Sequence, residues 1–345
     1  MNKELKVLTL DGGGVRGYLS AKILANIEQL LNEANNENIN IGQRFDLIAG
    51  TSTGGIIACA LSIGKSAKEI FNLYETLIPE VFIPQNSGIF QSKYSSDILK
   101  EKLKNILGSN TLADVITDLC ITSVDVENSS PRFHKSSYFG RNTIRLDEKL
   151  IDLALATSAA PTYFPLVDTL HSTNLTDGGM VANNPSLVAL IDAMELTDNN
   201  LKNISLISIG TGEQCHMPYD IESLKNGGKQ DWIVDIGTNT KASKAVQNIK
   251  DGKSKLKIAK DWFLSDDEKF SSKGSPILEL LMDSQSKLAH FQTQFLLKDT
   301  YLRINPKLSI PIELDSVDKI DSLKNLADLE QQQIEKIKKL LERKD

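Results

Sequence analysis

The sequence predicts an α/β fold in which a mostly parallel central sheet is covered by helices on both sides. Short apolar segments rich in β-branched residues alternate with longer segments whose apolar residues recur at helical spacing. The chain has 345 residues, of which 40% are hydrophobic and 24% are charged. This length and composition are sufficient to bury one large core.

Four segments are expected to form strands of the sheet. LKVLTL at residues 5–10 and FDLIAG at 45–50 are apolar and border glycines. DLCITSVDV at 118–126 and NISLISIG at 203–210 lack polar alternation, as strands covered on both faces do. Because helical segments separate several of these strands, we expect most of the pairing to be parallel.

Amphipathic spacing predicts the covering helices. Residues 19–33 and 54–64 follow the first two strands, and Pro185 lies near the start of a third helix in PSLVALIDAMEL. Residues 316–343 carry a leucine and isoleucine stripe and predict a C-terminal helix packed on the core, with a helix lying on a membrane as the alternative. Residues 222–230 and 250–276 are polar and are expected to be exposed loops.

Charge and cysteine content exclude several classes of protein. The net charge of -6 provides no basic face for a nucleic acid, so no nucleic-acid partner is expected. The three cysteines are far apart and odd in number, which argues against a disulfide framework and for a reducing compartment. The N-terminus does not have the form of an ordinary signal peptide, and no apolar stretch approaches ~20 residues, the length that spans a bilayer.

The loop DGGGVRG at residues 11–17 supports two interpretations. Gly12, Gly14 and Gly17 satisfy the G-x-G-x-x-G pattern of dinucleotide-binding folds. That fold also needs an acidic residue at the end of the second strand, whereas Glu33 lies at a helix end. In the other interpretation, glycine N–H groups at a helix N-terminus surround an oxyanion, with the fixed charge of Arg16 beside them.

The second motif, GTSTG at residues 50–54, favours the oxyanion interpretation. It has the G-x-S-x-G pattern and lies between a predicted strand and a predicted helix, which is the context of a nucleophile elbow. Gly50 and Gly54 would allow the tight turn that lifts Ser52 out of the sheet edge. Ser52 is therefore the candidate nucleophile.

A serine nucleophile needs a base. The four histidines, His134, His171, His216 and His290, do not lie in the strand-end settings typical of a catalytic base. Asp177, in TDGG, follows a short apparent strand in a glycine turn from which a carboxylate could approach a serine. The residues thus indicate a Ser52–Asp177 dyad, although an Asp-Gly pair by itself also favours an ordinary turn.

Taken together, these motifs resemble the patatin-like phospholipase family. DGGGVRG is similar to the family's oxyanion loop, GTSTGG to its nucleophile elbow and DGG to its catalytic aspartate motif. The end of the chain looks like the plant-patatin subgroup. Further segments match in the same order: SVDVENSSPRFH (123–134), ATSAAPTYFP (156–165), DGGMVANNPSLVAL (177–190), LISIGTG (206–212) and YLRINPKL (301–308).

The resemblance implies a three-layer α/β/α domain, with residues 1–212 as its catalytic core and 213–345 as loops and C-terminal helices completing it. It also implies calcium-independent hydrolysis of acyl lipids without cofactor or metal. Ser52 would attack the ester and Asp177 would take its proton. The amides of Gly12, Gly13 and Gly14 would hold the oxyanion, and Gly50 and Gly54 would support the site. Arg16 would support the glycine loop, with contact to a phosphate of the substrate as the alternative.

Two other functions use the same residues: acyl transfer to an alcohol, and lipid binding or storage without turnover. The intact Ser52, Asp177 and glycine loop argue against the second. The expected substrate is a membrane phospholipid, reached by peripheral contact from the cytoplasm, and export without a standard signal peptide remains an alternative. An unrestrained lipase would damage its own cell, so a covering loop among residues 212–275 or an activator is also expected.

Overall fold

The computed structural model describes residues 4–85, 91–138, 144–214, 221–227, 232 and 276–342. A seven-stranded sheet with the order β4-β3-β2-β1-β6-β8 runs through this part of the chain, and β5 pairs with β3 beside it. Its strands are β1 (Leu5–Leu10), β2 (Leu47–Gly50), β3 (Asp118–Asp125), β4 (Ser130–Lys135), β5 (Leu175–Asp177), β6 (Ile204–Ile209) and β8 (Tyr301–Ile304). Two short strands, β7 (Glu213–Gln214) and β9 (Lys307–Leu308), form a separate parallel pair.

The predicted α/β fold with a mostly parallel sheet is confirmed. β1 lies in the middle and pairs in parallel with β2 and β6, and β3 and β8 extend the parallel arrangement outward. Only β4 and β5 are antiparallel, and both pair with β3. The loops that follow β1 and β2 therefore leave the sheet at the same edge.

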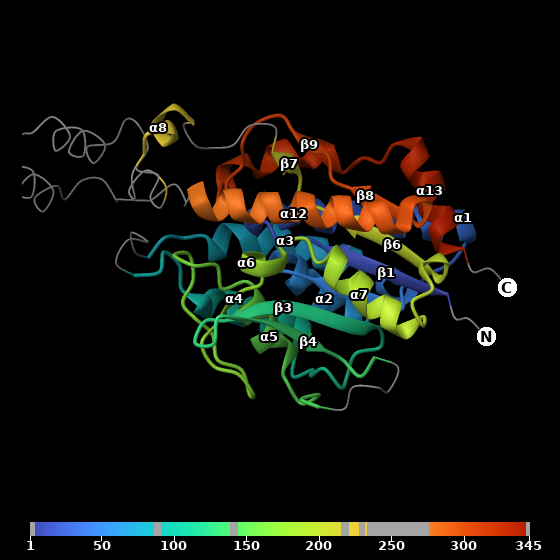
Figure 1. Cartoon of the computed structure of the whole chain (residues 1–345), viewed down its shortest axis with the longest axis horizontal. Helices are drawn as coiled ribbons and strands as arrows, with labels where there is room; N and C mark the ends of the chain where they lie inside the picture. The colour runs from blue at the N-terminus through green and yellow to red at the C-terminus, as the bar shows by residue number, and fades with distance from the viewer. Residues whose placement is uncertain are drawn as a thin grey trace, which may run out of the picture.

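Helices cover both faces of the sheet, which gives three layers. Figure 1 shows α6, α7 and α12 in front of the strands, where α12 contacts both α6 and α7. The helices of this face are α6 (Gly179–Ala182), α7 (Ser186–Leu196) and α12 (Pro276–Leu297). The other face is covered by α1 (Gly17–Asn35), α2 (Thr53–Ser62), α3 (Ala67–Val81), α4 (Ser96–Leu107), α5 (Leu150–Thr157) and α13 (Gln331–Leu341).

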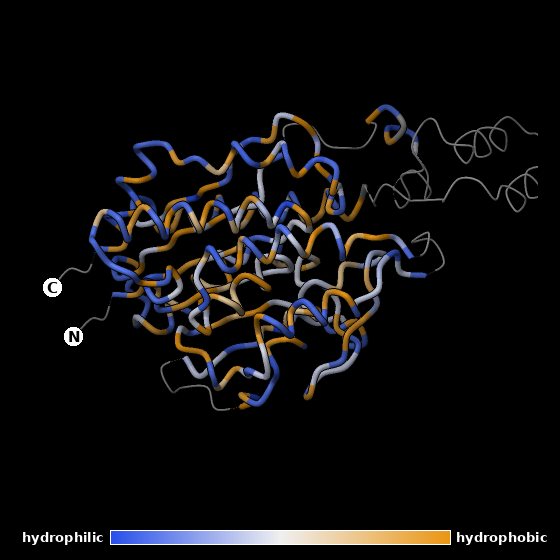
Figure 2. The backbone as a smooth tube through the Cα atoms, turned by 180° about the vertical axis from the view of Figure 1, so that it is seen from behind, coloured by the Kyte–Doolittle hydropathy of each residue, from blue (hydrophilic) through white to orange (hydrophobic). Residues whose placement is uncertain are grey.

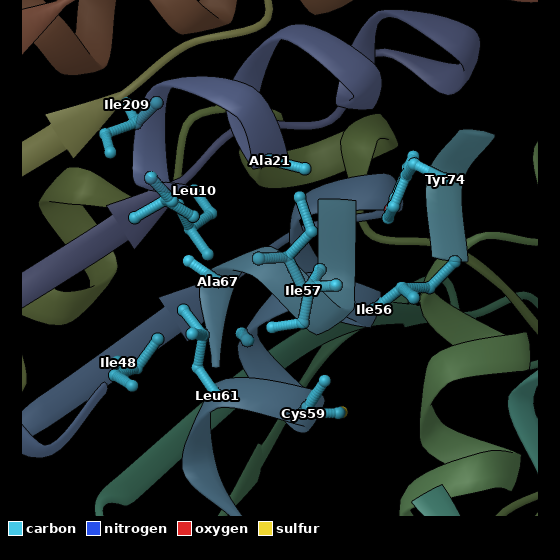
Figure 3. Packing of buried hydrophobic residues seen from close by; sticks show 14 of the residues in the cluster. Leu10, Ala21, Ile48, Ile56, Ile57, Cys59, Leu61, Ala67, Tyr74 and Ile209 are labelled. Atoms are coloured by element: carbon cyan, nitrogen blue, oxygen red, sulfur yellow. The ribbon is translucent and has the colours of Figure 1, made fainter. Parts of the chain in front are cut away.

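Alternate residues of the strands supply two cores. In β1, Leu8 and Leu10 belong to the core under α1 and α2, whereas Leu5 and Val7 belong to the core under α7. Figure 3 shows Ile57 of α2 between residues of β1 and of the neighbouring helices. Figure 2 shows hydrophobic positions repeated along the strands and helices of this layered body.

Some local expectations are wrong. The apolar stripe of residues 316–343 forms two elements, a 3-10 helix (Val317–Ala327) and α13. A capping box of Glu330 and Gln333 starts α13 anew, and the spacing of the stripe hides this break. The predicted loop at 222–230 begins with the short helix α8 (Ile221–Lys225), and α12 was not predicted. Residues 250–275 lie outside the described residues.

Candidate active site

The candidate site lies where three strands end. β1 and β2 are in register, with Leu10 opposite Gly50, so the glycine loop and the GTSTG turn start side by side. Asp177 is the last residue of β5, which runs antiparallel to β3. Residues far apart in the sequence thus meet at one edge of the sheet, the usual place of a site in an open α/β fold.

Ser52 occupies a strained turn between β2 and α2. Its φ of 53° and ψ of -126° are unusual for a residue with a side chain. A Cβ at Gly50 would lie 2.4 Å from the carbonyl oxygen of Gly54, and a Cβ at Gly54 would lie 2.3 Å from that of Leu10. Both positions therefore require glycine. The Ser52 N–H donates to Thr157 Oγ1 at 2.8 Å, which fixes the turn.

Asp177 lies within hydrogen-bonding distance of this serine. Ser52 Oγ donates to Asp177 Oδ2 at 2.6 Å, and the Gly179 N–H donates to Asp177 Oδ1 at 2.6 Å. The Asp177 N–H donates to the carbonyl oxygen of Ala159 at 3.1 Å, so the backbone is also fixed. Both side chains are buried. The arrangement orients the carboxylate to accept the serine proton.

Burial sets the protonation behaviour of Asp177. Desolvation raises the pKa of its carboxyl from 3.8 to about 7, and the hydrogen bonds from Ser52 and Gly179 oppose that rise. A base with a pKa near the working pH can take a proton in one step and return it in the next. This carboxyl therefore has the protonation behaviour of a general base at neutral pH.

The glycine loop offers two unoccupied donors near Ser52. Among the described residues, the N–H groups of Gly13 and Gly14 make no hydrogen bond, whereas the Gly12 N–H donates to the carbonyl oxygen of Asn183 at 3.0 Å. The prediction that Gly12 is a donor to the oxyanion therefore conflicts with this bond. Gly14 has a φ of +57°, and a Cβ there would lie 2.1 Å from the Leu314 carbonyl oxygen.

Two arginines accompany this loop. Arg16 Nε donates to the Gly13 carbonyl oxygen over a long 3.4 Å, which is a weak support of the loop. Arg303, which the sequence did not single out, holds Asp11 at the start of the loop with both guanidinium nitrogens, one of them 2.8 Å from Asp11 Oδ1. A residue of β8 thus anchors the loop that follows β1.

A mostly apolar cavity opens beside Ser52 and Asp177. Ser52 and Asp177 lie in its wall with Gly14. The remaining surface comes mainly from aliphatic and aromatic side chains, among them Ile56, Tyr74, Leu77, Val81, Leu99 and Met282. A cavity with this apolar lining suits an alkyl chain.

The other candidate residues lie elsewhere. His134 bonds Ser123, His171 bonds Asp147 and His290 bonds Tyr301, and none of the three lines the cavity. Cys59 and Cys120 are buried free thiols. His216 and Cys215 lie outside the described residues. Within the described part of the chain, no cluster of His, Cys, Asp and Glu could hold a metal ion.

Sequence reasoning missed three side chains of the site. Thr157 fixes the serine turn, Asn183 lies against Gly12, and Met282 of α12 lines the cavity. Thr157 and Asn183 belong to segments that were matched to the family without a role. For Met282, the helical spacing of apolar residues in 277–297 was a usable signal.

Comparison with known proteins finds a matching family model, similar sequences and a similar solved structure. Residues 8–190 match the model of a family described as patatin-like phospholipase. Patatin-like protein 4 of Arabidopsis thaliana is 31% identical over 324 residues, 87% of this chain and 75% of that protein. A cGAMP-activated phospholipase of Escherichia coli (strain TW11681) is 37% identical over 236 residues, 64% of this chain and 66% of that protein. The crystal structure of VipD from Legionella pneumophila covers 98% of this chain and 67% of its own, with a TM-score of 0.48 and 13% identity.

Proposed function

Because the chain belongs to the patatin-like phospholipase family, we propose that it hydrolyses carboxylic esters of glycerophospholipids, with Ser52 as nucleophile and Asp177 as general base. The observation that carries this proposal is the 2.6 Å hydrogen bond between Ser52 Oγ and Asp177 Oδ2 in the wall of an apolar cavity. The Ser52 hydroxyl would attack the ester, and the cavity would hold the acyl chain.

In the proposed first step, Asp177 accepts the proton of Ser52 as Oγ attacks the ester carbonyl carbon. The N–H groups of Gly13 and Gly14 donate to the resulting oxyanion. As the tetrahedral intermediate collapses, the ester C–O bond breaks and Asp177 returns the proton to the departing lysolipid alkoxide. An acyl ester on Ser52 remains.

The second step regenerates the enzyme. Asp177 takes a proton from water, whose oxygen attacks the acyl carbon, and the proton then returns to Ser52 Oγ as free fatty acid leaves. Peptide N–H groups stabilise the negative charge in both steps. We therefore expect hydrolysis to be independent of calcium.

We also propose that the protein reaches its substrate by peripheral contact of α12 with a lipid bilayer. Several apolar side chains are exposed along α12, with polar ones such as Ser284, Lys287 and Gln292 among them. The exposed apolar residues are Ile277, Leu280, Leu281, Leu288, Phe291 and Phe295. The inner side of the same helix contributes Met282 to the catalytic cavity, so a bilayer on the outer side would lie near the cavity. Among the helices that the structure describes, none is long and apolar enough to cross a membrane.

The test is release of fatty acid from phospholipid in the presence of EDTA. We expect wild type to release it and Ser52→Ala to lose on the order of 10³-fold or more in rate, as activated nucleophiles do on removal. Ser62→Ala is the matched control, because Ser62 is a buried serine at the end of α2, the helix that Ser52 precedes, and its hydroxyl donates to the Cys59 carbonyl oxygen. Full activity of Ser52→Ala would refute the assignment.

Hydrolysis is further proposed to depend on an activator. The relatives named cGAMP-activated phospholipases motivate a direct trial of that nucleotide. The release assay is therefore run with and without cGAMP. A rate that is high without it and unchanged by it would contradict control by this ligand.

A further inference from the structure

A second cavity lies next to the one at Ser52 and Asp177. Met282 and Leu314 line both cavities, so the two adjoin near the glycine loop. The walls of the second cavity are otherwise largely polar, and they include Arg16, Asn183, Gln214, Glu279 and Asp283. A lipid whose acyl chain occupies the first cavity would place its polar end toward the second.

The charges of this cavity come from two different elements. Arg16 follows the glycine loop, whereas Glu279 and Asp283 are four residues apart on α12 and therefore share a side of that helix. Both carboxylates raise the pKa of Arg16, against the lowering effect of its burial, so they lie within electrostatic reach of its guanidinium. Arg16 itself makes no ion pair with any described residue, and Asp283 pairs with Lys287 at 2.8 Å.

Asn183 adds a buried acceptor without a donor. Its side chain is only 7% exposed, and its Nδ2 donates to Ser286 Oγ at 2.9 Å. Its Oδ1 has no partner among the described residues and faces Gly12 in the glycine loop. An unpaired buried oxygen costs about 1–3 kcal/mol, a cost that an N–H donor of a bound ligand would remove.

Resting on the proposed function, we propose that this cavity binds the head group of a phosphatidylethanolamine-type lipid. The phosphate lies at Arg16, and the primary ammonium lies at Glu279 and Asp283. A primary ammonium supplies N–H donors for carboxylates and for an amide oxygen. None of the described lining residues is aromatic, so the cavity lacks the aromatic cage that quaternary ammonium groups prefer. Anionic head groups meet the two carboxylates and are disfavoured.

The experiment compares hydrolysis of four esters with the same acyl chains in non-ionic detergent micelles. They carry ethanolamine, choline or glycerol head groups on phosphate, and diacylglycerol serves as the ester without a head group. Every rate is divided by the rate on diacylglycerol, so that general damage to catalysis cancels. We expect wild type to prefer phosphatidylethanolamine over phosphatidylglycerol, and Glu279→Gln/Asp283→Asn to reduce that preference about tenfold, the scale of one charge-assisted hydrogen bond. Asp97→Asn/Glu101→Gln, which neutralises two exposed acidic residues four positions apart on α4, is the charge-matched control with the wild-type preference.

The possible failures are distinguishable. Equal relative rates on all three phospholipids would overturn the head-group proposal and leave the hydrolase proposal intact. If wild type hydrolyses none of the four esters, either with or without cGAMP, the hydrolase proposal fails, and binding then decides the head-group proposal. In calorimetric titrations, dihexanoyl phosphatidylethanolamine should bind Ser52→Ala more tightly than it binds the triple variant Ser52→Ala/Glu279→Gln/Asp283→Asn. Equal affinities of these two variants would overturn the proposal. The proposal would also fail if Ser52→Ala bound dihexanoyl phosphatidylglycerol more tightly than dihexanoyl phosphatidylethanolamine.

Discussion

At the scale of single residues, the site depends on a carboxyl group whose charged form is disfavoured by burial. Asp177 is fully buried, its only described side-chain partners are the Ser52 hydroxyl and the Gly179 N–H, and no cation lies among them. Desolvation therefore outweighs both hydrogen bonds and raises the pKa of Asp177 to about 7. The proposed chemistry uses this raised pKa, because a more acidic aspartate would be a poor proton acceptor.

We predict that the rate follows the ionisation of Asp177. Because the base must be unprotonated in the free enzyme, kcat/KM should fall as the pH drops below about 7. At pH 5, about two units lower, the rate should be roughly one-hundredth of its plateau. A pH profile of kcat/KM on a soluble ester measures this. A plateau that extends unchanged to pH 5 would contradict the role of Asp177.

The same pKa shift predicts a pH-dependent stability. The pKa of Asp177 in the folded state, about 7, exceeds that of an unfolded aspartate, about 3.9, so its stabilising contribution is complete below pH ~4 and disappears as the pH rises to about 7. The Asp177→Asn variant has no carboxyl group at this position, so it does not lose this stability as the pH rises. Its unfolding free energy relative to wild type should therefore increase between these pH values, by up to ~4 kcal/mol. Urea denaturation at several pH values measures the difference, and a constant difference would rule the shift out.

At the scale of elements, α12 carries different chemistry on its two sides. Ser286 on its inner side accepts from Asn183, and Gln285 donates to the Met180 carbonyl oxygen, so the helix is fixed against α6 and the start of α7. Phe291 and Phe295 on its outer side are 65% and 77% exposed. Large exposed aromatic residues on one helix are typical of a surface that contacts a membrane or another protein. We assign the bilayer because of the lipid substrate proposed for the adjoining cavity.

We predict that Phe291→Ser/Phe295→Ser weakens binding to phosphatidylcholine vesicles by about tenfold or more, since burial of each phenylalanine contributes about 1.5–3 kcal/mol. The net charge of -6 provides no general attraction to anionic lipid, so binding should depend little on salt. Vesicle sedimentation measures both effects. Leu170→Ser, at an exposed leucine outside α12, is the control. Equal binding of the double variant and wild type would exclude this surface.

At the scale of the whole molecule, the last third of the chain supports the site at the first strand. β8 adds to the central sheet beside β6, and Arg303 of β8 reaches Asp11 and Ser208. The Leu314 carbonyl oxygen accepts from the Val15 N–H behind the glycine loop. We therefore propose that residues 213–345 complete the domain begun by 1–212.

The buried pair of Arg303 and Asp11 makes this dependence measurable. Arg303→Met leaves the Asp11 carboxylate buried without its partner, which typically costs about 3–5 kcal/mol of stability. Removal of Arg303 further raises the pKa of Asp11, already raised by burial, so the loss should grow as the pH rises. Addition of Asp11→Asn should restore part of the stability. Arg132→Met, which breaks the more exposed pair with Asp125, should cost much less in the same denaturation series. Similar losses of stability in Arg303→Met and Arg132→Met would refute the claim that the buried Arg303–Asp11 pair supports the fold.

Residues whose type is required by the backbone immediately around them could be predicted from the sequence. Gly50 and Gly54 must be glycine because a Cβ would collide with backbone, and this requirement produces the motif that identified Ser52. Contacts between distant segments leave no such pattern. Arg303 meets Asp11 across 292 residues, and Thr157 meets Ser52 across 105. The break between the 3-10 helix and α13 was hidden for another reason, since the apolar spacing continues through it.

Covalent labelling of the nucleophile tests the central claim without knowledge of the substrate. A fluorophosphonate probe reacts with an activated serine, and peptide mass spectrometry identifies the residue that carries the label. We predict labelling of the peptide that contains Ser52 in wild type and in Ser62→Ala, and a labelling rate lower by roughly 10³-fold in Asp177→Asn. Label on another residue, or equal labelling rates in wild type and Asp177→Asn, would contradict a Ser52–Asp177 dyad.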